Sequence, residues 1–348
     1  MSGKASNVLA IGNRILPLLV FPAITYQAWH IMFGYGQQAG TFAKLATKCT
    51  PSTPYTLAYT GIQSIDAALC PLVAFFDTML EPQHSMPFNV ELLTAALAIV
   101  PYLEAARSGR NILLELHWVM GIIYQKMTGA VIFPLYWMLF VVTGAASLHR
   151  TPRSATAGSI DQRHAESAAF TLLVAYILPS IAMLFARSPY TIAFWQAFPL
   201  WMFLAQRLYL AVRPACPRSG AKTVNAIYLS LFALSAVPHV YLLTPIVFKS
   251  YDVLVAIGTL FMPSLTPLDP KSTTFDHGVQ DFIQWDGVLM LVSTFFATAW
   301  IAGPSIKRLG VLACWLTCSM ALYGPGAAIA GVFWWRESLI RKESGRES

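Results

Sequence analysis

Nine apolar segments, most of them close to the length of a membrane-spanning helix, follow one another along this chain and restrict what it can fold into. They lie near residues 10–33, 57–80, 88–106, 119–147, 166–186, 190–212, 225–247, 281–302 and 308–335. A helix needs about 20 mostly apolar residues to cross the hydrocarbon core of a bilayer. The segment 88–106 is the weakest, because it is short and carries Glu91 and Glu104. We therefore predict an all-α, polytopic transmembrane bundle of eight or nine helices.

The composition supports the same fold class. Charged residues make up only 11% of the 348 positions, whereas a soluble domain carries about 25%. Residues 1–335 are predicted to form a single transmembrane helical domain, and residues 336–348 a charged, disordered tail. The connection 248–280 contains the apolar piece "VLVAIGTLFMP". This piece is too short to span a bilayer, so we predict a short re-entrant or interfacial helix there.

The basic residues indicate contact with a membrane. The net charge is +7, and Lys and Arg lie in the loops and at the C-terminus, where they flank apolar segments. This placement is typical of anchoring in a bilayer, so we expect no nucleic-acid partner. Alternate loops carry nearly equal numbers of Lys and Arg. The positive-inside rule therefore gives no orientation from the sequence.

The sequence shows no pattern of cysteines typical of disulfides or zinc sites, and none of the common cofactor motifs. The five cysteines form no CxxC pair and three of them lie in apolar segments, so we predict neither a disulfide framework nor a zinc site. The sequence contains no DDxxD, NxxxDxxxD or DxDD motif, no Walker loop, no GxGxxG and no HExxH. We expect no metal and no cofactor in the chemistry of this chain.

Polar residues inside the second apolar segment form the first candidate site. Asp66 and Asp77 are eleven residues apart, which is about three helical turns, so they project from one side of a helix. Tyr59 and Gln63 extend the same polar stripe. Ionisable groups within membrane helices are costly and often functional. We interpret Asp66 as a candidate acid, whereas Asp77 lies near the helix end and also fits an interfacial role.

A second candidate lies in "NILLELHWVMGIIYQKMTGAVIFPLYWMLF". Glu115 and His117 are two residues apart and point in different directions on a regular helix, so they converge only if the turn is irregular. Glu115 shares a face with Gln125, and His117 shares one with Tyr124. A glutamic acid beside a histidine is a plausible proton donor with its partner. The alternative is an interfacial pair at the mouth of a helix.

The third candidate is the stretch "FDHGVQDFIQWDGVLMLV". Asp281, Gln284 and Trp285 share one face of the predicted helix by their spacing. Asp281 fits either a pocket acid or an N-terminal cap favoured by the helix dipole. Asp286 lies a turn deeper and points elsewhere, and a cap cannot explain it.

Aromatic side chains are abundant and suit one class of chemistry. An acid protonates an alkene or an epoxide, and aromatic faces stabilise the cation that then moves along the folded chain. Such residues more often serve packing, which remains the alternative. Further candidate substrate-binding residues within the apolar segments are Tyr136, Trp195, Gln196 and Trp201.

Four short blocks carry a family resemblance. They are "GIQSIDAALCPLVAFFD" (61–77), "YQKMTGAVIFPLYWML" (124–139), "FWQAFPLW" (194–201) and "VQDFIQWDGVLM" (279–290). In these blocks and in helix order, residues 60–330 resemble the fungal integral-membrane terpene cyclases of meroterpenoid pathways of the ascochlorin, ascofuranone and macrophorin type. The resemblance implies cyclisation of a prenylated aromatic or quinone-like substrate. The reaction would start with protonation of a terminal epoxide or olefin.

We therefore predict a metal-independent terpene cyclase of the membrane, located in the endoplasmic reticulum, which binds a lipophilic farnesylated substrate and membrane lipid without an obligate protein partner. The candidate proton donors are Asp66, Glu115, Asp281 and Asp286. The candidate residues that tune the donor by hydrogen bonding are His117, Gln125 and Gln284. Two alternatives remain open: a transporter or receptor-like bundle with a proton or cation path, and a sterol-isomerase-like double-bond isomerase.

Overall fold

The computed structural model describes residues 2–80, 96–150 and 158–343, and over these residues the fold is helical, with one isolated bridge between Asp161 and Ser219. The first half contains α1 (Ser2–Trp29), the π-helix η1 (His30–Tyr35), α2 (Gly36–Gln38), α3 (Thr41–Thr47), α4 (Gln63–Met79), η2 (Ala96–Ala98), α6 (Val100–Ala105), η3 (Ile112–Leu116), α7 (His117–Met127), α8 (Gly129–Val142) and η4 (Ala145–Arg150). The second half contains α9 (Gln162–Leu172), η5 (Leu173–Ile177), α10 (Leu178–Ala186), α11 (Pro189–Gln196), α12 (Phe198–Val212), α13 (Ala221–Lys249), α14 (Val253–Phe261), α15 (Phe275–Ala302), α16 (Ile306–Tyr323) and α17 (Pro325–Glu343).

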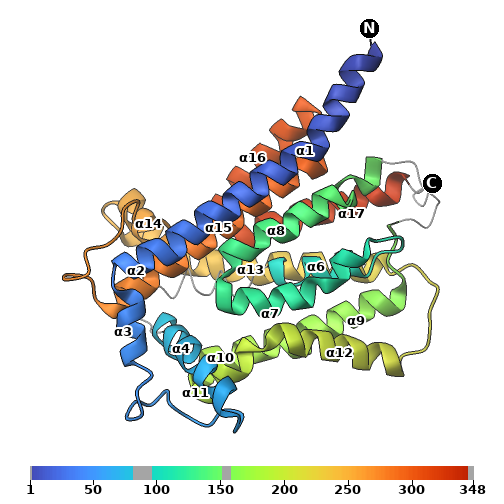
Figure 1. The fold of residues 1–348 in the computed structure, drawn as a ribbon. Coiled ribbons are helices and arrows are strands. Elements are labelled where there is room, and N and C mark those ends of the chain that lie inside the picture. Colours follow the sequence, from blue (N-terminus) through green and yellow to red (C-terminus); the bar gives the residue numbers. More distant parts are fainter. Residues whose placement is uncertain (1, 81–95, 151–157, 344–348) are drawn as a thin grey trace.

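The helices pack as an elongated bundle (Figure 1). The long helices α1 and α15 lie along one side and α9 to α12 along the other, with α8, α13 and α17 between them. The principal pairs are α1 with α8, α8 with α15, and α13 with α17. Six segments are long and apolar enough to cross a membrane: Ile15–Gln38, Gly129–Leu148, Gln162–Ala186, Ala221–Lys249, Phe275–Ala302 and Ile306–Tyr323. The predicted class, an all-α polytopic bundle in the membrane, is confirmed.

The helices are more numerous than the eight or nine that we predicted, because several apolar segments are broken into two. Segment 119–147 forms α7 and α8, with a break at Thr128, whose backbone lies at φ 70° and ψ 153°. Segment 308–335 forms α16 and α17, with a break at Gly324, where φ is +86°. Positive φ favours glycine and ends a helix. In segment 88–106, residues 88–95 lie outside the described part of the chain, and the rest forms only η2 and α6.

Two expectations about the connections have different outcomes. The apolar piece after residue 250 forms the nine-residue helix α14, as predicted for a segment too short to span. By contrast, α17 continues to Glu343, into the tail for which we predicted disorder. Arg336 and Glu337 explain this difference, because both are buried in a network of ion pairs.

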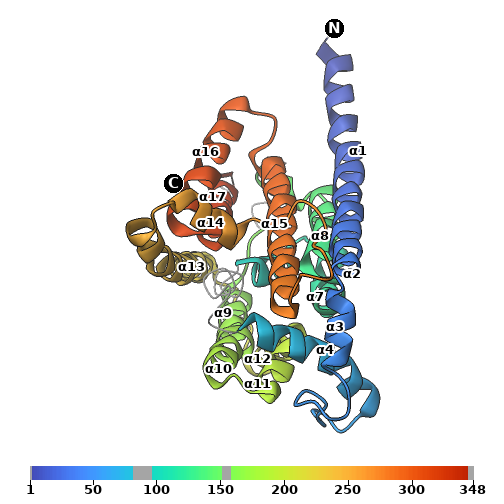
Figure 2. The same cartoon turned by 90° about the vertical axis from the view of Figure 1, so that its left-hand side faces the viewer.

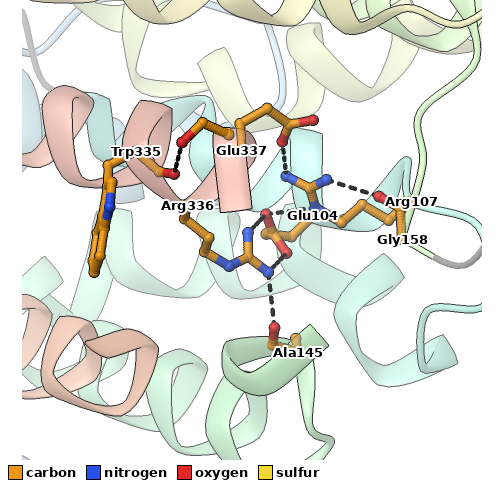
Figure 3. Close-up of polar contacts among 8 residues, drawn as sticks. Glu104, Arg107, Ala145, Gly158, Trp335, Arg336 and Glu337 are labelled. Atoms are coloured by element: carbon orange, nitrogen blue, oxygen red, sulfur yellow. Dashed lines mark hydrogen bonds and ion pairs between the residues drawn. The ribbon is translucent and has the colours of Figure 1, made fainter. Parts of the chain in front are cut away.

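This network joins α6 to α17 (Figure 3). The Glu104 carboxylate accepts hydrogen bonds from Nε of Arg107 at 2.9 Å and from Nη2 of Arg336 at 2.9 Å. Arg107 also donates to Glu337 at 2.7 Å, and Arg336 donates to the carbonyl of Ala145 at 2.8 Å. All four charged side chains are buried. Two acids therefore balance two guanidinium groups in the interior.

A disulfide joins Cys49, just after α3, to Cys70 in α4. Our prediction that the cysteines form no disulfide was wrong. The two residues are 21 positions apart and one of them lies within an apolar helix, so their spacing gives no recognisable pattern. The bond forms because α3 folds back against α4.

Candidate active site

A cavity of about 290 Å³ lies where α3, α4, α7, α8 and α15 meet. Its wall is mostly apolar and rich in aromatic rings, which include Phe75, Phe76, Phe133, Trp195, Phe198 and Phe282. Neighbouring rings contact each other, with centroid distances of 5.3 Å between Phe76 and Trp195 and 5.4 Å between Phe75 and Phe282. We refer to this space as the acid cavity, because Asp286 also forms part of its wall.

Asp286 is held in place by a different helix. Its Oδ1 accepts a hydrogen bond of 2.6 Å from the backbone N–H of Ala130, in the first turn of α8. The first N–H groups of a helix have no partner within that helix. Asp286 satisfies one of them from α15, and the carboxyl group is thereby oriented by the N-terminus of α8. Our prediction that a cap cannot explain Asp286 was wrong, because Asp286 caps a helix that lies far away in the sequence.

The break between α7 and α8 makes this contact possible. Thr128 holds a positive φ, which ends α7 and places the buried N-terminus of α8 beside α15. Gly129 then allows close approach, because a Cβ at this position would lie 2.5 Å from Sδ of Met290. Met290 is one helical turn beyond Asp286 on α15. The glycine thus leaves room for the end of the Met290 side chain beside the start of α8.

The charge of Asp286 has no strong compensation nearby. Within the described residues, no Lys or Arg forms an ion pair with its carboxyl group. Lys126, in the last turn of α7, borders the same cavity, but it is exposed. A carboxyl group on an apolar, aromatic wall can exchange a proton with a bound molecule, and the rings can stabilise a cation formed there.

Comparison with known proteins places the chain in a family. Residues 16–341 match the CtvD domain. The chain belongs to the CtvD domain family. It is also 25% identical, over 357 residues, to "Terpene cyclase ascI" from Acremonium egyptiacum, and the match covers 93% of this chain and 91% of that protein. No solved structure matches the chain.

The CtvD match agrees with the geometry. It spans every element of the acid cavity, from Phe33 in η1 to Met290 in α15. The resemblance to fungal terpene cyclases that the four sequence blocks predicted is confirmed. Four of the candidate site residues named from the sequence line the acid cavity of this CtvD-family chain: Asp286, Tyr124, Gln125 and Trp195.

The polar stripe on α4 lies elsewhere. Asp66, in the first turn of α4, accepts hydrogen bonds of 2.8 Å from both the N–H and the hydroxyl of Thr60. Slight desolvation opposes ionisation, but these bonds and one from Gly61 hold the pKa of Asp66 below its usual value. Asp77 accepts from the hydroxyl of Tyr55 at 2.7 Å. Both carboxylates therefore have local partners that fasten the preceding loop to α4.

Tyr59 and Gln63, the other two residues of the predicted polar stripe, lie in the same region as Asp66 and Asp77. The hydroxyl of Tyr59 donates to the carbonyl of Tyr55 at 2.7 Å, and its ring lies against Tyr190. Gln63 begins α4 and is exposed. Neither residue forms part of the described wall of the acid cavity.

Glu115 and His117 do not converge, although the turn between them is irregular, as η3 is a 3-10 helix. Glu115 forms an ion pair of 2.7 Å with Arg110 near the surface. His117 is buried with its ring 4.0 Å from that of Tyr102. Burial lowers the pKa of His117 to about 4, so this imidazole is neutral at physiological pH.

The face of α15 that carries Asp281 contacts the segment connecting α14 to α15. Asp281 accepts a hydrogen bond of 2.6 Å from the N–H of Ser264, and Trp285 donates to the carbonyl of the same residue at 3.1 Å. Gln284 donates to the carbonyl of Leu260 at 2.8 Å. These three candidates fasten the end of α14 and the loop after it to α15.

The remaining candidates are part of the helix packing. Tyr136 lies in the core with its ring centroid 5.0 Å from that of Trp137. Gln196 is buried at the end of α11, and Trp201 donates to the carbonyl of Phe194 at 2.8 Å. A catalytic role for any candidate outside the acid cavity stays a prediction.

Sequence reasoning missed several residues of the cavity wall. Phe75 and Phe76 stand in the first resemblance block, and Phe282 is one turn before Asp286, so the aromatic content of these blocks was an available signal. Gly129 gave no such signal. Its importance depends on the approach of Met290 from another helix.

Proposed function

We propose that this CtvD-family chain is a terpene cyclase that starts its reaction by donating a proton from Asp286. The observation that supports this proposal is the position of a carboxyl group on the aromatic wall of a cavity between membrane helices. The similarity to a protein named terpene cyclase supports the same reaction class.

In the proposed mechanism, Asp286 carries its proton when the substrate binds. The proton passes to the oxygen of a terminal epoxide or to a carbon of a terminal olefin, and a carbocation forms at the adjacent carbon. Double bonds of the prenyl chain then attack in turn and close rings. Loss of a proton from the final cation, which an anionic Asp286 can accept, returns the acid to its starting state. The product is an isomer of the substrate.

The surrounding residues supply three contributions. The N–H of Ala130 orients the carboxyl group of Asp286 throughout the cycle. The rings of Phe282 and Trp195 present negative faces to the migrating cation. The apolar wall favours ring closure over capture by water, because water reaches such a cavity only at a cost.

The substrate class follows from the setting. A farnesylated phenol or quinone-like compound is lipophilic enough to partition into the bilayer, and a membrane-embedded cavity gives it direct access. We propose such a compound as the substrate, with membrane lipid as the only other partner. We place the protein in the membrane of the endoplasmic reticulum.

The test is to incubate the purified protein in detergent with a farnesylated phenol and, separately, with its terminal epoxide. The expected product has the mass of the substrate, at least one new ring and correspondingly fewer carbon–carbon double bonds, as determined by mass spectrometry and NMR. A product with a moved double bond and no new ring would instead indicate a sterol-isomerase-like reaction. Absence of any product of equal mass from either compound would overturn the proposal.

A further inference from the structure

A second and larger cavity lies beside the first. It has a volume of about 700 Å³ and is enclosed by α13, α14, α15, α16 and α17. Among its described lining residues, only His239 and Thr317 carry nitrogen or oxygen in their side chains. We call it the apolar chamber. Its position away from Asp286 means that the proposed chemistry leaves it without a role.

The apolar chamber and the acid cavity share two lining residues. Met290 and Leu97 line both spaces. Met290 lies one turn beyond Asp286, and methionine has a flexible side chain that adapts to neighbouring groups. A rotation of Met290 would join the chamber to the acid cavity. The two cavities therefore form neighbouring parts of one potential binding site.

The apolar chamber also reaches the surface of the bundle at α16. Ala313, Thr317 and Ala321 all line it, all are exposed, and their spacing of four residues puts them on one stripe of the helix. Because α16 is long and apolar enough to span the membrane, this exposed stripe would face lipid in a bilayer. Small side chains along it leave an opening between the chamber and the bilayer.

The volumes indicate how a substrate would divide between the two spaces. Ligand sites usually measure about 300–1,000 Å³, and the acid cavity alone is at the lower end of this range. We propose that the apolar chamber admits the prenylated substrate from the bilayer and holds its aromatic ring, while the prenyl chain passes between Met290 and Leu97 to reach Asp286. This inference rests on the proposed function, because it assumes a prenylated aromatic ligand.

Photolabelling tests this proposal without requiring turnover. A farnesylated phenol with a diazirine on its ring is bound to the full chain in lipid nanodiscs, irradiated, and mapped by mass spectrometry. We expect labels on the chamber residues of α13 and α16, and unlabelled farnesylated phenol should compete with them. Labels confined to the acid cavity would overturn the proposal. So would labels that excess phospholipid removes equally well, because the chamber would then be a lipid site.

A matched pair of variants tests the opening. Thr317→Trp fills the mouth of the chamber, whereas Val311→Trp places the same ring at an exposed position of α16 outside it. We expect Thr317→Trp to lower chamber labelling at least tenfold and Val311→Trp to change it less than twofold. Equal labelling of the two variants would overturn the proposal. If no cyclised product forms but labelling behaves as expected, the proposed function fails and the binding site stands.

A second inference concerns orientation in the membrane and rests on the disulfide. Cys49–Cys70 lies at the end of the bundle that carries α3 and the start of α15, where Lys44 donates to the carbonyl of Pro270. We call this the disulfide end. Figures 1 and 2 show that the N-terminus of α1 points the opposite way, and Figure 1 shows the C-terminal end of α17 there too. Disulfides form in oxidising compartments and are rare in the cytosol.

The charges of the described connections agree with this assignment. The starts of α9, α13 and α16 and the ends of α12 and α17 lie opposite the disulfide end (Figure 1), and the Lys and Arg at or next to these helix ends are Arg163, Arg213, Arg218, Lys222, Lys307, Arg308, Arg341 and Lys342. The disulfide end carries α3, the ends of α7, α10 and α13, and the start of α15 (Figure 1), and the Lys and Arg in or next to these segments are Lys44, Lys48, Lys126, Arg187, Lys249 and Lys271. Cytoplasmic loops carry the excess of Lys and Arg. We infer that the disulfide end faces the non-cytosolic side and that the end of α17 faces the cytosol.

Protease protection of sealed microsomes tests this orientation. An epitope appended after Ser348 should be digested from outside in intact vesicles, since the cytosolic face is exposed. Cys49 and Cys70 should resist alkylation in unfolded protein until a reductant is added. Protection of the epitope from the protease would overturn the proposed orientation. Free thiols at both Cys49 and Cys70 would also overturn it, because the orientation rests on the disulfide.

Discussion

Glu104 and Asp286 are both carboxylates inside the helix bundle, but their surroundings differ. Glu104 lies between the guanidinium groups of Arg107 and Arg336 and borders no large cavity. Although burial alone would raise it, these two cations hold the pKa of Glu104 below its usual range. Asp286 accepts a hydrogen bond from a backbone N–H and lines an aromatic cavity. Within the described residues it forms no ion pair. A compensated buried acid supports the fold, whereas an uncompensated acid on a cavity wall is available for chemistry.

The largest effect on stability is expected at the compensated site. Arg336→Met leaves Glu104 buried with one cation fewer, and breaking a buried pair in this way costs about 3–5 kcal/mol of unfolding free energy. Arg213→Met removes the partner of Glu166 at a solvent-accessible pair, where water and salt screen the attraction and the loss should be hard to detect. Denaturant titration of both variants in detergent measures the difference. Equal stability of the two variants would show that the network is not structural.

A somewhat smaller loss is expected from the disulfide, which holds two walls of the acid cavity together. Replacing both cysteines, Cys49→Ser with Cys70→Ser, releases a loop with a sequence separation of 21 residues and should cost about 2–4 kcal/mol. Cys314→Ser changes a free, exposed thiol and serves as the control. Thermal unfolding with and without reductant gives the comparison. The account expects reductant to destabilise the wild type and leave the double variant unchanged.

An effect on rate alone is expected from the aromatic wall. Phe282 is one turn from Asp286, and a cation over a ring gains about 0.5–2 kcal/mol. Phe282→Leu should therefore lower kcat by about 2- to 30-fold with little change in KM. Phe203→Leu removes a ring that stacks on Trp118 outside the described cavity wall, and should leave kcat within twofold. Equal losses in both variants would argue against stabilisation of a cation by this wall.

The smallest effects are expected at acids that already have partners outside the cavity. Asp66→Asn and Glu115→Gln should each keep activity within about threefold, because neither carboxylate reaches the acid cavity. Initial rates at equal amounts of folded protein measure this. A tenfold loss in either variant would restore that residue as a proton donor.

The sequence predicted some features and left others hidden for definable reasons. The apolar segments were sufficient for the all-α membrane class, and the depth of Asp286 in its helix separated it from Asp281. Its partner Ala130 stood out in no pattern, because the contact joins residues 156 positions apart across the break at Thr128. Likewise, the sequence showed Glu104 only as a charged residue that weakens a predicted membrane span. Its partner Arg336 lies 232 residues away, so no local pattern indicated the ion pair.

Helical spacing also misled where a loop was the true partner. Asp281, Gln284 and Trp285 share a face, as predicted, but this face binds backbone groups of residues 260–264 and not a cavity of substrate size. Spacing shows which side chains lie together on a helix. It does not show what packs against them.

The most direct test compares cyclised product formed by Asp286→Asn and Asp281→Asn with that of the wild type, at equal amounts of folded protein. In Asp286→Asn the side-chain amide retains an oxygen that can accept from the N–H of Ala130, so the fold should persist, but the amide has no proton of suitable acidity. Loss of a general acid costs about 10²–10⁴-fold in rate. The account predicts a loss of this size for Asp286→Asn and near-normal product from Asp281→Asn. Wild-type rates from Asp286→Asn, or equal losses in both variants, would contradict it.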